Sequence, residues 1–584
     1  MHRRTYGWIQ NPSDFAKLKK TVQIFDSTSD HYSQLKKELV PSLIPIKEIR
    51  EDLLAKLEKS CTEFSYPELV GFKQDAFGKR NISRAEAVAD SLIQVSIPSQ
   101  SVKTTGKNWT DNWTATGYLS WALSLNFLKH DRETDTCRIT SSGKTLSESA
   151  DGSAEEFEIL QGAILRYPPA TQVLNILSNS DTPITKFHIG NQLGFKGEKG
   201  FTSYREDLML DWLLTAPDAD LRKKIRQDIE GTSDKYARMI AGWLKKLGLV
   251  KQQREDGTTE SGEKLTPFPS YSITATGEHE LRKSKGSSNN SIVEKYLTWE
   301  FLAVGSAESD YTRSRRSVIL QALSASNSKN SLIQKLRKCG FDDDFAVIKN
   351  DIAGLNTFGI RIDTVGDKIY LRDKITPFSV PKISFTEDQR SNELKLLKEK
   401  IMAETDLDPK YYALIDIAYD GNRSRDYEIM TIDLLTNVYG FKGKLLGNSR
   451  RPDGIVYTPD FGITIDTKAY SKGYSKNISQ EDEMVRYIED NQLRDAKRNP
   501  NKWWEEFDPN IPADSHYFLW VSSQFKETFT QQLASTSART NSKGGALGVE
   551  QLLIGADLIN KGKLKLSDVE ASLRNDLINW ESSN

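Results

Sequence analysis

The spacing of hydrophobic residues predicts the same unit three times in the first two thirds of the chain: an amphipathic helix followed by a two-stranded hairpin. The units fall within residues 114–149, 233–284 and 345–373. In the second unit, apolar residues recur at intervals of three and four, as on one helix face: Tyr236, Met239, Ile240, Trp243, Leu244 and Leu247. Each helix is followed by a residue that can form a left-handed C-cap: Asn126, Gly248 and Gly359.

A helix followed by a hairpin forms the second half of a winged helix, a fold that places a helix in the major groove of DNA. Such pieces also occur in unrelated α+β proteins. Here the hairpins of the first two units both end in Ile-Thr-x-x-Gly, at residues 139–143 and 273–277. This repetition favours tandem winged-helix-like subdomains.

The region after residue 392 has a different pattern, in which helices and strands alternate. A helix is predicted over 426–440, followed by two β-rich runs, 454–458 and 462–470, that a tight turn joins. Later elements are a helix, a strand, a helix and a strand-helix pair, at residues 481–498, 516–523, 526–536 and 544–562. The pattern predicts an α/β domain with helices packed on a sheet.

Polar segments near residues 150, 287 and 385 are rich in Ser, Gly, Pro or charge, which is typical of linkers. At about 150 residues per domain, a chain of 584 residues is expected to form about four domains. We therefore predict three front subdomains, a linker and a rear domain, at residues 1–152, 153–289, 290–375, 376–392 and 393–584.

Composition and charge narrow the class of protein. The sequence has 37% hydrophobic residues and no apolar run long enough for a membrane span, so we expect no membrane contact and a place in the cytoplasm. The three cysteines lie far apart, which argues against a disulfide framework or a zinc site. Residues 386–584 carry 26 basic and 32 acidic residues, whereas residues 1–385 carry 54 and 49. A basic front suits a polyanion, and an acidic rear suits a metal site.

One group of residues in the rear domain points to chemistry. Asp453 precedes the first β-rich run, and Asp466 and Lys468 lie two apart in the second, so their side chains share one face of a strand. The hairpin can bring the two carboxylates together with the ammonium, and one or two carboxylates are typical protein ligands of Mg²⁺. The group therefore suits metal-assisted phosphodiester hydrolysis. The alternative is a Pro-Asp-Gly turn beside an unrelated surface pair.

Three further features each have a functional and a purely structural explanation. Gln10 and Asn11 carry amides suited to adenine, but such arms are often merely solvated. Lys235 and Arg238 begin the helix of the second unit, where side chains reach base edges or form a solvated face. Asp482 and Arg486 are four apart on a helix, so they can pair within it or across a two-fold interface.

The chain resembles the FokI-type type IIS restriction endonucleases almost from end to end. The motifs that carry the resemblance include GWIQNP, EGTSDKYARMI, RPDGIVY, IDTKAYSKGY and DEMVRYIEDNQ. The resemblance implies a multidomain α+β fold in which tandem winged-helix-like DNA-recognition subdomains precede an α/β PD-(D/E)xK nuclease domain. It also implies that the third subdomain packs on the nuclease.

The resemblance assigns roles by position. It implies that Asp453, Asp466 and Lys468 are catalytic and that Asp453, Asp466 and Thr467 bind Mg²⁺. It places two residues, Asp482 and Arg486, where the cleavage domains of two copies pair. It implies DNA contacts by residues of the first two subdomains: Gln10, Asn11, Arg84, Trp113, Gln227, Glu230, Lys235 and Arg238. Gln227 stands where the family has Asn, so the target is expected to be GGATG-like rather than certain to be GGATG.

We expect a Mg²⁺-dependent endonuclease that binds an asymmetric site in double-stranded DNA and cuts both strands downstream through transient dimerisation of its cleavage domains. A methyltransferase that protects the same site is expected of such a restriction-modification system. Two alternatives stay open at this point. One is a DNA-binding regulator whose nuclease-like domain only dimerises, and the other is an endonuclease that nicks one strand.

Overall fold

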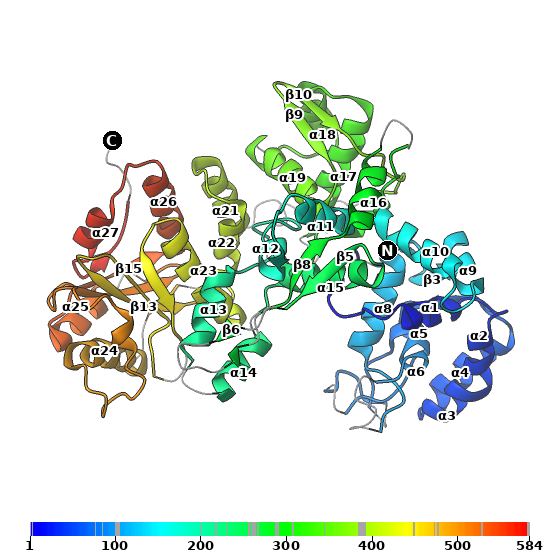
Figure 1. Cartoon of the computed structure of the whole chain (residues 1–584), viewed down its shortest axis with the longest axis horizontal. Helices are drawn as coiled ribbons and strands as arrows, with labels where there is room; N and C mark the ends of the chain where they lie inside the picture. The colour runs from blue at the N-terminus through cyan, green and yellow to red at the C-terminus, as the bar shows by residue number, and fades with distance from the viewer. Residues whose placement is uncertain are drawn as a thin grey trace.

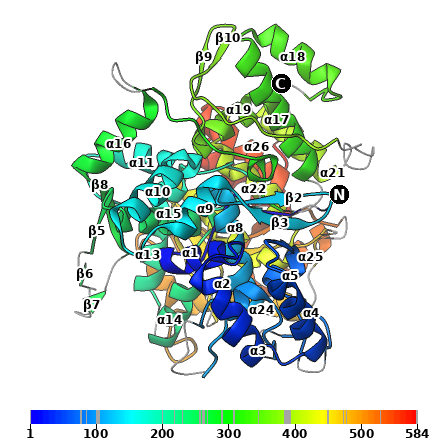
Figure 2. The same ribbon diagram turned by 90° about the vertical axis from the view of Figure 1, so that its right-hand side faces the viewer.

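The computed structural model describes residues 2 and 4–580 apart from 76–77, 84–85, 100–105, 199, 217–218, 229, 255–256, 259–263, 266–267, 287–290, 306–308, 344, 383–392, 448–449, 472, 476–477 and 527–528. Four groups of elements follow one another along the chain (Figure 1). The three predicted front subdomains lie mainly on one side of the molecule. The strand-rich rear domain lies on the other side. Figure 2, turned by 90°, has the first subdomain in front.

The first subdomain is mainly helical and contains one small sheet, with the strand order β1-β3-β2. Its elements are α1 (Phe15–Gln23), α2 (Asp30–Gln34), the π-helix Leu35–Leu39, α3 (Val40–Leu43), α4 (Lys47–Glu58), β1 (Glu63–Ser65), α5 (Tyr66–Val70), α6 (Leu92–Ser96), α8 (Asn112–Ser124), β2 (Leu128–Asp131), β3 (Thr136–Ile139) and α9 (Ser141–Glu148). The sequence pattern predicted α8 and the β2-β3 hairpin.

The second subdomain repeats this arrangement with the sheet order β4-β8-β5. Its elements are α10 (Ala154–Arg166), α11 (Pro168–Ser178), β4 (Ile184–Thr185), α12 (Lys186–Gly190), α13 (Glu206–Leu214), α14 (Ala219–Asp228), α15 (Thr232–Lys246), β5 (Val250–Gln253), β6 (Gly257–Thr258), β7 (Lys264–Leu265), β8 (Ser270–Ile273) and α16 (Ala275–Lys285). The predicted apolar face of α15 is buried, since Trp243 and Leu244 are fully inaccessible. α12 packs against α15.

The repeated Ile-Thr-x-x-Gly ending has a structural cause. The Thr140 and Thr274 hydroxyls cap helices α9 and α16 by accepting the amides of Gly143 and Gly277, each at 3.0 Å. A Cβ on either glycine would lie about 2 Å from a backbone carbonyl oxygen of the residue before the hairpin, which excludes any larger residue. The motif therefore fixes a helix against its own hairpin in both subdomains.

The third subdomain is smaller, and its described residues form the two-stranded sheet β9-β10. Its elements are the 3₁₀ helix Trp299–Leu302, α17 (Ser309–Ala325), α18 (Lys329–Lys338), α19 (Phe345–Phe358), β9 (Ile362–Val365) and β10 (Lys368–Leu371). The predicted C-caps of all three units adopt positive φ: +60° at Asn126, +70° at Gly248 and +112° at Gly359. The third unit lacks the Thr-x-x-Gly ending, in keeping with its weaker sequence pattern.

The rear domain is a six-stranded sheet, β11-β12-β13-β14-β15-β16, in which β11 to β13 are antiparallel and β13 to β16 parallel. Its strands are β11 (Lys442–Leu445), β12 (Gly454–Tyr457), β13 (Gly462–Lys468), β14 (His516–Ser522), β15 (Gly544–Gly548) and β16 (Asp576–Leu577). Its helices are α21 (Glu393–Glu404), α22 (Ala413–Ala418), α23 (Ser424–Asn437), α24 (Ile478–Leu493), α25 (Phe529–Thr540), α26 (Val549–Asn560) and α27 (Leu566–Ser572), with short 3₁₀ turns at Pro409–Tyr412, Gly421–Arg423 and Trp503–Glu506.

Strand β14 shows how this sheet is built. Phe518 and Trp520 face the core under α24 and α25, whereas Leu519 and Val521 face the core under α23 and α26. Alternate side chains of one strand thus serve two layers of helices, which confirms the predicted α/β class. The helix predicted to run to residue 498 ends at Leu493, because Arg494 adopts φ +50°. No helix within the described part of the chain is long and apolar enough to cross a membrane.

Candidate active site and DNA-reading surface

The β12-β13 hairpin brings the predicted catalytic residues together. Gly454 pairs with Ile465 in an antiparallel register, so Asp453 lies opposite Asp466 at the end of the hairpin. Lys468 Nζ lies 2.8 Å from each carboxylate oxygen of Asp466 and donates a hydrogen bond to Oδ1. Asp453 Oδ2 accepts the Thr467 amide at 2.7 Å and the Thr467 hydroxyl at 3.0 Å. The four neighbouring side chains thus form one compact polar group.

The electrostatics of this group favour a cation. Burial, and then the charge of Asp453, raise the pKa of Asp466, although Lys468 opposes the shift. Burial acts against the charge of Lys468, but the carboxylates of Asp466 and Asp453 outweigh it and raise the pKa of the ammonium. More negative charge therefore converges here than the single ammonium neutralises. Within the described residues, no three His, Cys, Asp or Glu side chains meet with metal-site geometry, so protein carboxylates alone would form an incomplete coordination shell.

Helix α23 adds a third carboxylate, Glu428, whose charge interacts with that of Asp453. Burial, followed by the charge of Asp453, raises the pKa of Glu428, while Arg425 lowers it. Arg425 pairs with Glu428 one helical turn away and stacks 3.6 Å above the ring of Trp212, a residue of α13 in the second subdomain. The neighbourhood of the active site thus contacts the front part of the molecule directly.

The nuclease-like domain contacts both the second and the third subdomains. Arg451 donates to the carbonyl oxygen of Thr215 at 3.0 Å, and Lys444 pairs with Asp211 at 3.3 Å. The Lys395 ammonium lies 4.0 Å from the ring centre of Tyr311 in α17. Contact with the third subdomain was expected, whereas the contacts through α13 were missed because nothing in a local pattern shows which distant surface a helix covers.

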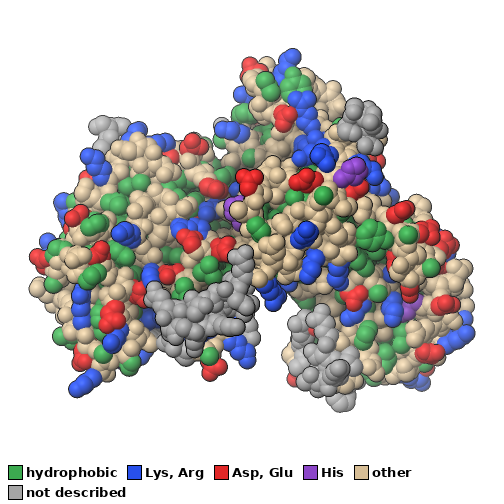
Figure 3. Space-filling view, viewed as in Figure 1, with side chains coloured by type: hydrophobic (Ala, Val, Ile, Leu, Met, Phe, Trp, Pro, Cys, Tyr) green, Lys and Arg blue, Asp and Glu red, His purple; other side chains and the backbone are tan. Residues whose placement is uncertain are grey.

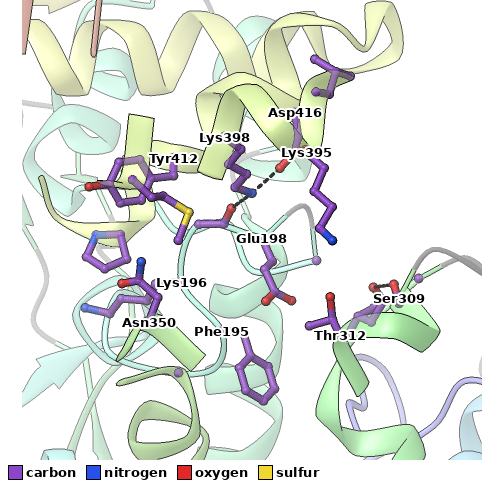
Figure 4. A pocket seen from close by; sticks show the side chains of 18 of the residues that line it. Phe195, Lys196, Glu198, Ser309, Thr312, Asn350, Lys395, Lys398, Tyr412 and Asp416 are labelled. Carbon is purple, nitrogen blue, oxygen red and sulfur yellow. Dashed lines mark hydrogen bonds and ion pairs between the residues drawn. The ribbon is translucent and has the colours of Figure 1, made fainter. Parts of the chain in front are cut away.

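A cavity of about 1500 Å³ separates α21 and α22 from the second and third subdomains. Figure 4 shows charged and polar side chains around it, among them Lys196, Glu198 and Lys395, and Lys398 hydrogen-bonded to Asp416 at 2.5 Å. The catalytic group is not among its lining residues. An interface that holds so large a cavity is more easily opened than a closely packed core.

The predicted DNA-contacting residues of the first subdomain divide into three cases. Gln10 Nε2 donates to the Tyr236 hydroxyl at 3.5 Å, which places the N-terminal arm on helix α15 of the second subdomain. Asn11 is exposed, and Trp113 is 60% exposed in the first turn of α8. Arg84 lies outside the described residues.

The notch that opens between the lobes in Figure 3 has Lys and Arg side chains at its rim.

The predicted DNA-contacting residues of the second subdomain lie near the start of α15. Glu230 precedes the helix and receives Arg238 Nε at 2.7 Å and Nη2 at 3.2 Å. Lys235 lies in the first turn of α15 and is partly exposed. Gln227 lies in α14, and its side chain is outside the described part. The structure also brings Lys186, which the sequence analysis missed, to 2.6 Å from Glu230.

The two predicted interface residues do not pair within helix α24. Asp482 instead accepts Arg539 Nη2 of α25 at 2.7 Å. Arg486 lies 5.2 Å from the ring of Tyr487, and its buried Nε has no hydrogen-bond partner within the described residues. The intrahelical pair is thus not formed, because Arg539 is the nearer cation for Asp482.

Family models match the chain in four consecutive stretches. The FokI recognition domain subdomain 1 matches residues 4–149, and subdomain 2 matches residues 156–289. The FokI D3 domain matches residues 302–367, and the FokI cleavage domain matches residues 390–579.

Two curated relatives span almost the whole chain. The type II restriction enzyme FokI of Planomicrobium okeanokoites is 40% identical over 590 residues, covering 99% of each chain. The type II restriction enzyme StsI of Streptococcus sanguinis is 29% identical over 603 residues, covering 100% of this chain and 97% of StsI.

Two solved structures agree with this. The structure of the restriction endonuclease FokI has a TM-score of 0.88 at 38% identity, and the structure of FokI bound to DNA has 0.90 at 39%. Each comparison covers 99% of this chain and 100% of the other. Four family models in the same order, together with this identity over the full length, show that the chain belongs to the FokI family of type II restriction enzymes.

Proposed function

We propose that this chain binds an asymmetric, GGATG-like site in double-stranded DNA and hydrolyses a phosphodiester bond of each strand at a fixed distance downstream. The observation that carries the proposal is the convergence of Asp453, Asp466 and Lys468 on one hairpin of a domain that is separate from the base-reading helices. A cutter that lies beside its reader cuts outside the bases that are read. We keep the division at 1–152, 153–289, 290–375, 376–392 and 393–584 as part of this proposal.

The donor set fits Mg²⁺. Asp453 and Asp466 are hard oxygen ligands, and the repulsion between their like charges, which contributes to the raised pKa of Asp466, favours a cation between them. Thr467 uses its amide and hydroxyl hydrogens on Asp453, so we assign its carbonyl oxygen as a further ligand. When bound, Mg²⁺ supplies Lewis-acid chemistry to the phosphoryl group and to water.

The residues of the chain have separate tasks in this scheme. Asp453 is held in place by Thr467, and Asp466 by Lys468, so both carboxylates are oriented before substrate arrives. Burial acts against the charge of Lys468, but the carboxylates of Asp466 and Asp453 raise its pKa, which favours the protonated ammonium. The ammonium can neutralise the negative charge that develops on the phosphoryl group.

DNA reading is assigned to the first two subdomains. Exposed Trp113 and Asn11 suit contacts from the first subdomain, and the Glu230, Lys235 and Arg238 group suits base edges at the start of α15. Gln10 and Gln227 complete the proposed set, as does Arg84.

Two nuclease domains are needed to cut two strands. Asp482, whose side chain is 54% exposed, supports a transient pair of cleavage domains on α24, and Arg486 one turn further along the same helix completes the proposed interface. A methyltransferase that protects the same site and a cytoplasmic location remain predictions. An enzyme that only nicks is the alternative, and it would leave supercoiled plasmid as open circles.

The test uses the whole purified protein and a long DNA that contains GGATG sites, with and without Mg²⁺. Sequencing of the ends is expected to give metal-dependent breaks at a fixed offset from one motif. Ends anchored to another motif would replace the expected target but keep the nuclease. Absence of cleavage in both conditions would overturn the proposal.

A further inference from the structure

A buried lysine that no sequence pattern predicts, Lys186, forms an ion pair with Glu230 just before the start of α15, the end proposed to read bases. Lys186 is the first residue of α12, and its side chain is only 7% exposed. Its Nζ lies 2.6 Å from Glu230 Oε1. The same oxygen accepts Arg238 Nε at 2.7 Å. One carboxylate thus joins a buried ammonium on one side to a guanidinium, 39% exposed, on the other.

The surroundings of Lys186 direct its ammonium to Glu230. On its other sides, Nζ lies 4.9 Å from the ring centre of Phe187 and 5.1 Å from that of Phe268, which meet edge to face. Aromatic rings stabilise the ammonium but accept no strong hydrogen bond. Burial lowers the pKa of Lys186, and Glu230 is the largest influence that opposes this shift.

The backbone around Lys186 is fixed as well. α12 lies against the start of α15, where a Cβ on Gly190 would lie 2.3 Å from Asp234 Oδ1. Asp234 accepts the Gly231 amide at 3.0 Å and the Ser203 hydroxyl at 2.6 Å, so it anchors the residues next to Glu230. Lys186 therefore presents its charge from a rigid support and not from a mobile chain.

We infer that Lys186 is a specificity-determining residue, which positions the ionised carboxylate of Glu230, and through it the guanidinium of Arg238, for contact with base edges. The inference rests on the proposed function, in which Glu230 and Arg238 read DNA. An ionised carboxylate only accepts hydrogen bonds, so it selects an amino group of cytosine or adenine and rejects bases that offer acceptors. Arg238 uses Nε and Nη2 on Glu230 and donates from Nη1 to Met239 Sδ at 3.6 Å, so one hydrogen of each Nη is left for guanine.

The role differs from that of a lysine that binds phosphate. Loss of a phosphate contact weakens binding to all sequences alike. Loss of Lys186 leaves Glu230 with only Arg238 as a charge partner, so the geometry of one or two base contacts changes while contacts to the backbone persist. The expected signature is a loss of discrimination at those base pairs.

The test measures binding of the whole protein to a randomised DNA library in Ca²⁺, followed by sequencing of the bound fraction. The variants are K186M, K186R and the control K285M, which removes another lysine of this subdomain, hydrogen-bonded to Asn175 at 2.6 Å. In K186M we expect preference at one or two base pairs to fall about tenfold or more, the discrimination that one good base contact supplies. Affinity for non-specific DNA should stay within about twofold of the wild-type value.

Rescue and a double variant separate positioning from folding. K186R should restore most of the preference, because arginine can also pair with Glu230, and K285M should leave it unchanged even if thermal stability falls. In an E230Q background, K186M should add little further loss. Equal weakening at every base pair, or full preference in a folded K186M protein, would overturn the inference. If the wild-type protein itself selected no motif, the proposed function would fail instead.

Discussion

Two clusters of buried charge in this protein have opposite balances. In the second subdomain, the single carboxylate of Glu230 meets two cations, Lys186 and Arg238, and although burial acts against it, Arg238 and Lys186 lower its pKa. In the nuclease domain, three neighbouring carboxylates share one lysine and one arginine, and burial with mutual repulsion raises the pKa of Asp466 and of Glu428.

The difference indicates that the Glu230 cluster is complete without a ligand, whereas the Asp466 cluster needs a cation. In the proposed reading cluster of Glu230, Lys186 and Arg238, the two cations more than neutralise the one carboxylate, so the cluster can be rigid before DNA arrives. The cutting cluster carries negative charge that its own cations do not balance, which costs stability in the absence of a metal. The predictions below test this contrast, from the largest effect to the smallest.

Substitution D466A should reduce cleavage by about a thousandfold or more, because it removes a proposed metal ligand and the partner of Lys468. DNA affinity should not change, since the reading cluster lies in another domain. Cleavage of plasmid DNA and gel-shift binding measure the two quantities. D460N, an exposed acid in the turn of the same hairpin, is the matched control, and unchanged cutting by D466A would remove this residue from the site.

Replacement of a carboxylate by its amide should have opposite effects on stability in the two clusters. E230Q should destabilise the metal-free protein by about 2 kcal/mol, because Lys186 loses its anionic partner while buried. D466N should leave stability unchanged or raise it, because it removes one of the repelling charges. Thermal unfolding without divalent ions gives both values, and shifts of the same sign would contradict the contrast.

Substitution R486A should slow double-strand cutting about tenfold at low enzyme concentration, an amount typical of a lost charged contact at an interface. The rate should recover as the concentration rises, because the proposed pairing of cleavage domains is bimolecular. R539A is the comparison variant for R486A, because Arg539 binds Asp482 within the same chain. Time courses that separate nicked from linear plasmid measure the effect, and no dependence on concentration would argue against pairing through α24.

Substitution W212F, which keeps a buried ring but weakens its cation–π contact with Arg425, should loosen the nuclease domain on the second subdomain by about 1 kcal/mol. A faster limited proteolysis between the third subdomain and the nuclease is the expected result. W109A, which lies in the first subdomain, is the control. If cleavage by the protease is no faster than in that control, Trp212 does not hold the domains together.

The last prediction is a pH dependence of stability from Asp234. Burial raises its pKa to about 7, so the folded protein keeps a proton that the unfolded chain releases near pH 4. Between pH 4 and 7 the folded state binds more protons, so the free energy of unfolding should fall as pH rises and level off above 7. D234N should flatten this slope. A slope identical to that of the wild-type protein would assign it to other groups.

The local pattern was sufficient for the elements that make the catalytic hairpin. Residues 453–468 predicted two strands with Asp466 and Lys468 on one face, and the register places Asp453 beside them. Helices α8, α15 and α19 and their C-caps were predicted for the same reason, since periodicity and capping depend on near neighbours. The resemblance to a family added the roles of single exposed residues, which no periodicity encodes.

Contacts between distant parts of the chain were decided by the tertiary structure alone. Lys186 lies 44 positions from Glu230, and Trp212 more than 200 from Arg425, so neither pairing leaves a trace in local spacing. Asp482 binds Arg539 and not Arg486, because packing of α24 on α25 supplies a nearer cation. The sequence determined which charges are available and on which elements they lie. Folding determined which of them are buried together, and burial is what turns a charge into a strong interaction.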